Sequence, residues 1–100
     1  MKQTDRPHDE AMAELYRDDP AFAIEVINSI LEDGDQAELL ITLRQLTKAF
    51  GGTAAVAEKA KLNSTQVYRT LSEGGNPTLL NLRALLDAMN LRLMVANKFS

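Results

Sequence analysis

The sequence predicts an all-α domain of about five or six helices with a short β-strand near its C-terminus. Three observations support this fold class. The 100 residues suffice for about one compact domain. Apolar residues recur at helical spacing from about residue 9 to residue 89, and capping residues and glycines separate these stretches. Residues 91–96 instead alternate with a period of two, which is typical of a strand.

The composition excludes several classes of protein. Hydrophobic residues make up 45% of the chain and charged residues 25%, so a disordered or collagen-like polymer is a poor fit. The absence of Cys excludes disulfides, thiolate nucleophiles and Cys-ligated zinc. Apolar runs are too short to span a bilayer, and the first residues lack the apolar stretch of a signal peptide. We therefore expect a soluble, cytoplasmic protein.

The charges are unevenly distributed along the chain. Residues 1–36 carry three Lys and Arg against ten acidic residues, whereas residues 37–100 carry eight against four. A polyanion would be repelled by the first part and tolerated by the second, so two different partners are expected. The alternative is an ordinary solvated surface. We divide the chain into residues 1–34, an acidic tail and helices that pack on the core, and residues 35–100, the domain that contains the strand.

The N-terminal residues 1–8 show no apolar periodicity and are expected to form a frayed tail. His8 stands alone there, so we expect it to be exposed and not to bind a metal, which would need several ligands on ordered structure. The first helix is expected to begin near Asp9, because Met12, Leu15 and Tyr16 recur at helical spacing after it.

Capping residues mark the next two helices. Asp19 is a suitable N-cap and Pro20 a suitable first residue for the second helix, which Gly34 is expected to end in a left-handed conformation. Asp35 resembles the start of a capping box, and the third helix is expected to run from there to about Phe50. Two consecutive glycines then predict a turn.

Residues 53–72, TAAVAEKAKLNSTQVYRTLS, have the pattern of a helix-turn-helix. Thr53 is expected to cap a short helix with a small inner face. Residues 61–63 form the turn, and the next helix turns Val67 and Leu71 toward the core. In such a motif the first helix supports the second, which enters the major groove of DNA. A generic helical hairpin that never binds nucleic acid is the alternative.

Three side chains of the second helix of this helix-turn-helix are predicted to read DNA bases. Thr65, Gln66 and Arg69 fall on the face opposite the core, where Gln can bind adenine and Arg can bind guanine. Phosphate contacts are expected from polar groups near the helix starts and from one tyrosine, which could instead belong to the core: Thr53, Asn63, Ser64 and Tyr68. Further basic residues could face the phosphates: Arg44, Lys48, Lys59, Lys61 and Arg83.

The C-terminal part is expected to contain one more helix and the strand. Thr78 is a suitable cap for that helix, and Asn90 can end it. Leu80 is expected to be partly buried, next to an apolar stripe formed by Leu79, Leu82, Leu85, Leu86 and Met89. In the strand, one face carries Leu91, Leu93 and Val95. A single strand has no partner within an all-α chain, so we expect it to pair with its copy in a homodimer or with another protein. An extended tail packed on the surface is the alternative.

Four segments together resemble a known family. An acidic helix is followed by EDGDQAELLITLRQLTKAFGG, by TAAVAEKAKLNSTQVYRTLS and by EGGNPTLLNLRALLDAMNLRL. This order, over residues 18–96, resembles the addiction-module antidote proteins, antitoxins of the HigA type. The resemblance implies a Cro/repressor-like (Xre-type, lambda-repressor-like) helix-turn-helix domain. It also implies that the chain neutralises a RelE-like ribonuclease toxin and, as a dimer, binds operator DNA to repress its own operon.

Other functions are weaker interpretations of this sequence. A stand-alone helix-turn-helix regulator would need no toxin, and a protein-interaction module would need no DNA. An enzyme is a poor fit, because the acids show no arrangement of nucleophile and base and the single His lies outside the expected core. We therefore expect no catalytic residue, no cofactor and no metal.

Overall fold

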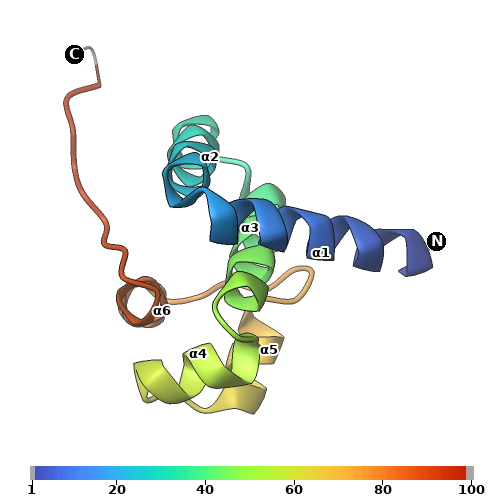
Figure 1. Cartoon of the computed structure of the whole chain (residues 1–100). Coiled ribbons are helices and arrows are strands. Elements are labelled where there is room, and N and C mark those ends of the chain that lie inside the picture. The colour runs from blue at the N-terminus through green and yellow to red at the C-terminus, as the bar shows by residue number, and fades with distance from the viewer. Residues whose placement is uncertain (1, 99–100) are drawn as a thin grey trace.

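The computed structural model describes the backbone of residues 2–98 and the side chains of residues 8–98. Within that range the chain forms six α-helices and no β-strand (Figure 1). These helices are α1 (Lys2–Asp18), α2 (Pro20–Asp33), α3 (Gln36–Ala49), α4 (Thr53–Ala60), α5 (Ser64–Thr70) and α6 (Leu79–Ala88). The all-α prediction of about five or six helices is confirmed.

Helix α3 occupies the centre of the domain. It packs against α1, α2 and α4, and α4 in turn packs against α5 and α6. The hairpin of α4 and α5 lies at the opposite end of the molecule from α2 (Figure 1). Seven residues of α3 are buried, and Leu40, Leu43 and Leu46 among them are almost inaccessible to solvent. One continuous apolar core therefore joins residues from α1 to the end of α6.

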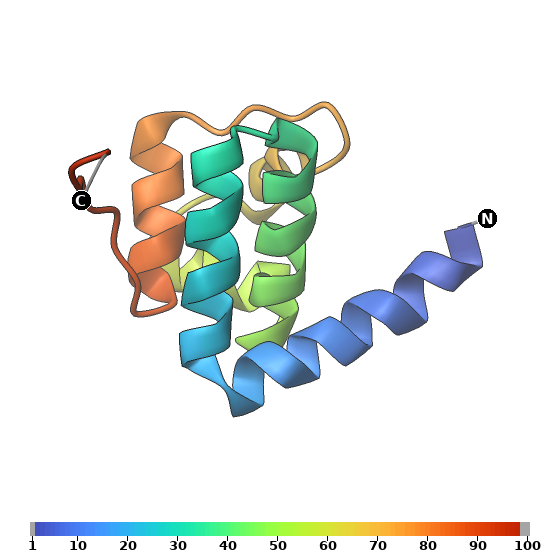
Figure 2. The same cartoon turned by 90° about the horizontal axis from the view of Figure 1, so that it is seen from above.

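Helix α1 crosses the ends of α2 and α3, and its N-terminal half extends beyond the rest of the domain (Figure 2). Among the described side chains of α1, those of Ala13 and Tyr16 are buried. Arg17 donates hydrogen bonds from Nε to the carbonyl oxygen of Ala49 at 3.2 Å and from a terminal nitrogen to that of Lys48 at 3.3 Å. A cation at the last carbonyls of a helix is favourable, because those groups carry partial negative charge. The hydrogen bonds of Arg17 thus add to the burial of Ala13 and Tyr16 in holding α1 on the domain.

Most of the predicted helix ends are confirmed. Asp19 accepts a hydrogen bond from the Phe22 N–H, and Asp35 accepts one from the Glu38 N–H. Gly34 ends α2 in the left-handed conformation with φ of 79°. At the last helix, the Thr78 hydroxyl accepts from the Asn81 N–H at 3.1 Å, and Asn90 follows with φ of 64°. Each of these helix ends is determined by a residue that lies at the end itself or within a few positions of it.

The predicted frayed tail is wrong for the residues that the structure describes, because α1 begins at Lys2. Residues 2–8 have no apolar stripe of their own, but they continue a helix that Ala13 and Tyr16 anchor on α3. Extending an existing helix adds one hydrogen bond per residue, so it needs no apolar face. His8 accordingly lies on an ordered helix and not in a tail.

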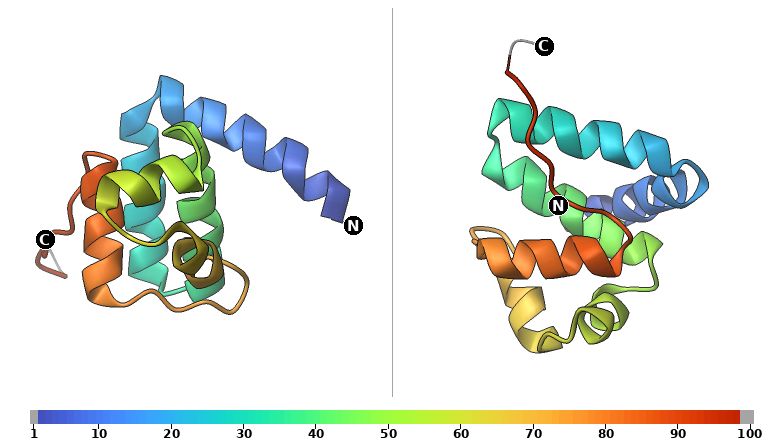
Figure 3. Two further views of the ribbon diagram at one scale, coloured as in Figure 1. Left: turned by 90° about the horizontal axis from the view of Figure 1, so that it is seen from below. Right: turned by 90° about the vertical axis from the view of Figure 1, so that its left-hand side faces the viewer.

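The predicted C-terminal strand is also wrong for the described chain. Residues 91–97 have no regular secondary structure and run as an extended segment from the end of α6 past α2 (Figure 3). Leu91 and Leu93 pack on the core, whereas Val95 is 98% exposed. A strand requires the ladder of a second strand, and the described chain provides none.

The first turn of α6 departs from expectation as well. Leu80, predicted to be partly buried, is 72% exposed, and Leu79 is 65% exposed. Burial of α6 begins after them: Leu82 is half-buried and packs against the core, and Leu85 and Leu86 are buried. The apolar stripe read from the sequence therefore extends one turn further than the core that covers it.

Candidate functional site

Helices α4 and α5 form a hairpin with a turn of three residues, as predicted. Lys61 ends α4 in the left-handed conformation, with φ of 61° and ψ of 42°. Asn63 caps α5, because its side-chain oxygen accepts a hydrogen bond from the Gln66 N–H at 3.0 Å. Glycine is the residue that adopts a left-handed conformation without steric cost, so a lysine at this turn is unusual.

The two faces of α5 differ as the sequence predicted. Val67 is buried, and so is Leu71, which follows the last turn. Thr65, Gln66 and Arg69 are all exposed on the outer side of the helix. The structure therefore brings the three predicted base-reading residues to one exposed face, and their contact with DNA stays a prediction.

Thr53 occupies a different position from the one expected. It is the first residue of α4, and the N-cap is Gly52, which supplies no side-chain hydrogen bond. The Thr53 hydroxyl lies 3.0 Å from the Thr47 hydroxyl, which also lies 2.7 Å from the Arg44 carbonyl oxygen. A carbonyl only accepts, so Thr47 donates to Arg44 and Thr53 donates to Thr47. The hydrogen of the Thr53 hydroxyl is thereby engaged in joining α3 to α4.

The remaining candidates for phosphate contact lie near the start and outer side of α5. Asn63 is exposed and Ser64 is half-buried. Tyr68 is 57% exposed, so the alternative that it belongs to the core is wrong. The hairpin that contains Asn63, Ser64 and Tyr68 also carries three exposed basic residues, Lys59, Lys61 and Arg69. Against three basic residues, the segment 53–72 carries one acid, Glu58.

Arg44 does not join this basic surface. Its side chain is half-buried, and one terminal guanidinium nitrogen donates a hydrogen bond to the backbone carbonyl oxygen of Leu71. The expectation that Arg44 could face the phosphates is therefore wrong, because the guanidinium holds the end of α5 in place. Arg83 is exposed but lies on α6, outside the hairpin.

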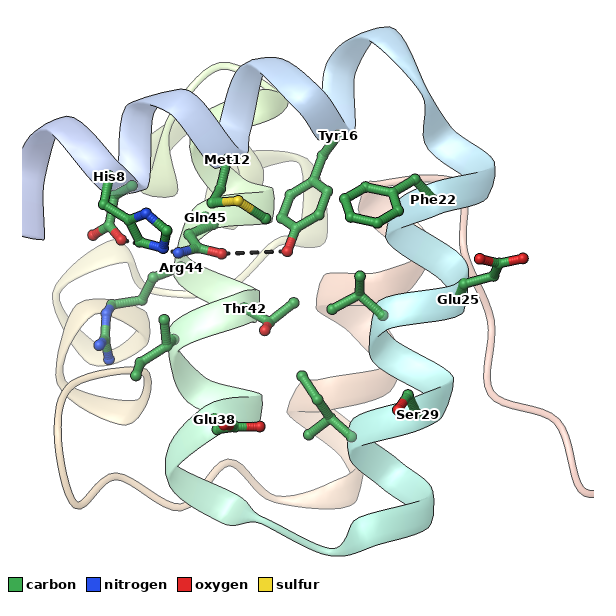
Figure 4. Close-up of a pocket in the computed structure, with 14 residues that line it drawn as sticks. His8, Met12, Tyr16, Phe22, Glu25, Ser29, Glu38, Thr42, Arg44 and Gln45 are labelled. Carbon is green, nitrogen blue, oxygen red and sulfur yellow. Dashed lines mark hydrogen bonds between the residues drawn. The ribbon is translucent and has the colours of Figure 1, made fainter.

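A second feature, which the sequence did not reveal, is a groove of about 720 Å³ lined by residues of α1, α2 and α3 (Figure 4). Beside it, the Tyr16 hydroxyl donates to the side-chain oxygen of Gln45 at 3.3 Å, and the Gln45 amide nitrogen donates to Asp9 at 3.0 Å. Burial raises the pKa of Tyr16 above 10, and a hydrogen bond with Thr42 offsets part of that rise. We name this feature the α1–α2–α3 groove.

The groove combines apolar and acidic residues. Its apolar lining residues are Met12, Tyr16, Phe22, Val26, Ile30 and Ile41. Charged lining residues include Asp9, Glu25 and Glu38, one from each of the three helices. No periodic pattern in the sequence indicates such a site, because its lining comes from three separate helices; the excess of acids in residues 1–36 is the one signal that points to it.

Metal-ligand clusters and membrane-spanning helices are both absent from the described residues. No group of three or more His, Asp or Glu residues there could hold a metal ion. In the same range, no helix is both long enough and apolar enough to cross a membrane.

Comparison with known proteins assigns the chain to a family. A family model described as a probable addiction module antidote protein matches residues 9–97. The chain belongs to this family. An antidote counteracts a toxin, so membership in the antidote family implies a toxin as partner. No curated protein and no solved structure matches this antidote-family chain.

Proposed function

We propose that this antidote-family chain is a HigA-type antitoxin that binds operator DNA as a homodimer, represses its own operon and neutralises a RelE-like ribonuclease toxin. It would act in the cytoplasm, as an inhibitor and regulator and not as an enzyme. The observation that carries the DNA-binding part is the orientation of α5: Val67 is buried, while Thr65, Gln66 and Arg69 face outward.

The residues of the hairpin are suited to two kinds of DNA contact, with bases and with phosphates. Gln66 can donate to and accept from adenine, and Arg69 can donate two hydrogen bonds to guanine, so these side chains read bases. Thr65 stands beside them. Asn63, Ser64, Tyr68 and the backbone N–H of Thr53 are suited to phosphates, which fix the position of the helix on the duplex. In this role α5 is the recognition helix of a Xre-type helix-turn-helix.

A dimer would place two copies of α5 in successive major grooves. Their separation would be about 34 Å, one turn of the duplex, and the operator would be nearly palindromic. The segment with Leu91, Leu93 and Val95 is extended and pairs with no strand of the described chain, so it remains the candidate for pairing between copies. Leu93→Pro removes a backbone donor and should lower the dimer mass seen by sedimentation; an unchanged mass would reject this pairing.

The decisive experiment is a titration of the purified protein with DNA from immediately upstream of its own gene. At about 150 mM salt, binding at least ~10³ tighter than to random DNA would establish specific recognition. Arg69→Ala should then cost roughly 1–3 kcal/mol and relax the preference at one base pair. Arg83→Ala removes the same charge from α6 and should leave base preference unchanged. Equal affinity for upstream and random DNA would favour a protein-interaction module without DNA binding.

A further inference from the structure

We propose that the α1–α2–α3 groove is the docking site for a basic, amphipathic segment of the toxin. In this arrangement an apolar side chain of the toxin lies on the floor of the groove, and flanking Lys or Arg side chains meet the acidic residues at its edge. The inference rests on the proposed antitoxin function and adds to it the surface and the chemistry of the contact.

The floor of the groove can accept an apolar side chain. Tyr16 and Phe22 form an aromatic pair with ring centroids 5.9 Å apart at the end that α1 closes. Ile41 lies on the α3 side and is 40% exposed, although it is large and apolar. Phe22 and Val26 are half-buried. Covering this surface would remove apolar area from water, which is the main favourable contribution to association.

The edge of the groove is acidic. Glu25 on α2 and Glu38 on α3 both line the groove, and the Glu25 side chain lies on the outer side of α2 (Figure 4). Both are exposed, and neither forms an ion pair with another described residue. Asp9 accepts from Gln45 and adds a third carboxylate. The lining also includes Arg44, which keeps its positive charge while it donates to the Leu71 carbonyl. Three carboxylates outweigh this one guanidinium, so the field at the groove favours a positively charged partner.

The same charges argue against other occupants. Nucleic acid would meet three carboxylates, so its phosphates would be repelled. A second copy of this chain, related by a two-fold axis through the groove, would bring acidic edges together. A ribonuclease, in contrast, binds a polyanion and therefore needs a basic surface. Because the α4–α5 hairpin lies at the other end of the molecule, docking here leaves α5 exposed (Figure 1).

The apolar contact is tested with a matched pair of variants. The probe is the purified protein encoded by the gene that adjoins its own, titrated by calorimetry. Ile41→Lys places a charge on the groove floor, and affinity should fall by about tenfold or more. Leu15→Lys makes the same change at a residue that is 49% exposed and outside the groove, and affinity should stay within about twofold. Equal losses for both variants would overturn the docking site.

A second pair of variants tests the charges without disturbing the packing. Glu25→Gln combined with Glu38→Gln should weaken binding and reduce its dependence on salt. Glu14→Gln combined with Glu32→Gln removes the same charge outside the groove and should retain the salt dependence of the wild type. If both pairs behave alike, long-range attraction and not docking explains the acidic surface, and the proposal is rejected.

The experiment distinguishes failure of the proposed antitoxin function from failure of the proposed docking site. If the wild-type chain does not bind the probe, the antitoxin function proposed for this pair of proteins fails, and the docking site with it. If the wild type binds and the groove variants bind equally well, the function stands and the docking site alone is wrong. Operator binding by Ile41→Lys should match the wild type, which also verifies that the variant is folded.

Discussion

Arg44, at the middle of α3, donates a hydrogen bond to the backbone carbonyl oxygen of Leu71, the residue that ends α5. Among the described helices, α5 packs closely on α4 only. The guanidinium therefore gives α5 a second attachment, directly to the central helix. The position of the proposed recognition helix depends on a residue that lies outside the hairpin.

Arg44→Met should lower the free energy of unfolding by about 1–2 kcal/mol, because it removes a charged donor from a half-buried carbonyl while keeping most of the apolar stem. Urea unfolding measures this change. The matched control is Arg83→Met, an exposed arginine on α6 whose replacement should change stability little. Equal stability of the two variants would mean that the bond to Leu71 contributes nothing.

The cap of α5 separates stability from DNA binding. Asn63→Ala removes the acceptor of the Gln66 N–H and should cost about 1 kcal/mol of stability. Asn63→Asp keeps an acceptor and should preserve stability, but its charge should weaken operator binding through repulsion of a nearby phosphate. Operator affinity of the aspartate variant equal to that of the wild type would place Asn63 away from the phosphates.

Replacing the left-handed Lys61 should raise stability and weaken DNA binding at the same time. Lys61→Gly relieves the steric cost of the positive φ and should raise stability by a few tenths to about 1 kcal/mol. Loss of the charge should also reduce the slope of log affinity against log salt by about 0.9, if Lys61 neutralises one phosphate.

Lys61→Ala is the control for this residue, because it removes the charge and keeps the strained backbone. It should reduce the salt slope to the same extent without the gain in stability. A glycine variant with an unchanged salt slope would show that Lys61 does not contact the DNA.

Stability at high pH should depend on Tyr16. Its pKa in the folded protein is raised by burial, so the folded state holds the phenolic proton more tightly than the unfolded state does. The contribution of the protonated Tyr16 to stability is therefore fully present below pH 10, the ordinary pKa, and is lost as the pH rises through the folded-state pKa.

Tyr16→Phe should reduce this loss above pH 10 and, at neutral pH, cost about 1 kcal/mol through the missing bond to Gln45. Thermal unfolding between pH 7 and pH 11 measures both effects. Tyr68→Phe at an exposed position serves as the control and should keep the pH dependence of the wild type. The assignment is wrong if both variants lose stability with pH as the wild type does.

The helix ends were predictable because their causes are local. Asp19, Asp35 and Thr78 each accept from a backbone N–H three residues later, so a short window of sequence contains both partners. The exposed face of α5 was predictable for the same reason, since Val67 and Leu71 fix its orientation.

The errors arose where residues of another helix decide the structure. Thr53 is engaged by Thr47, and Arg44 by Leu71 at 27 positions along the chain. Helix α1 extends to Lys2 because it is anchored on α3, which its polar first residues do not reveal. The α1–α2–α3 groove needs three helices to form, so no single segment predicts it.

The attachment of α1 has a consequence for the exchange of backbone amides with solvent. Among residues 8–18 of α1 the buried side chains are Ala13 and Tyr16, whereas α3 buries Leu39, Leu40, Leu43 and Leu46, so detaching α1 exposes less apolar surface than opening α3 does. Helix α1 should therefore open as a separate unit, and its amides should exchange before those of α3. Opening also removes one wall of the α1–α2–α3 groove. A ligand in that groove is thereby coupled to the closed state, and its binding should be readable as slower deuterium uptake in α1.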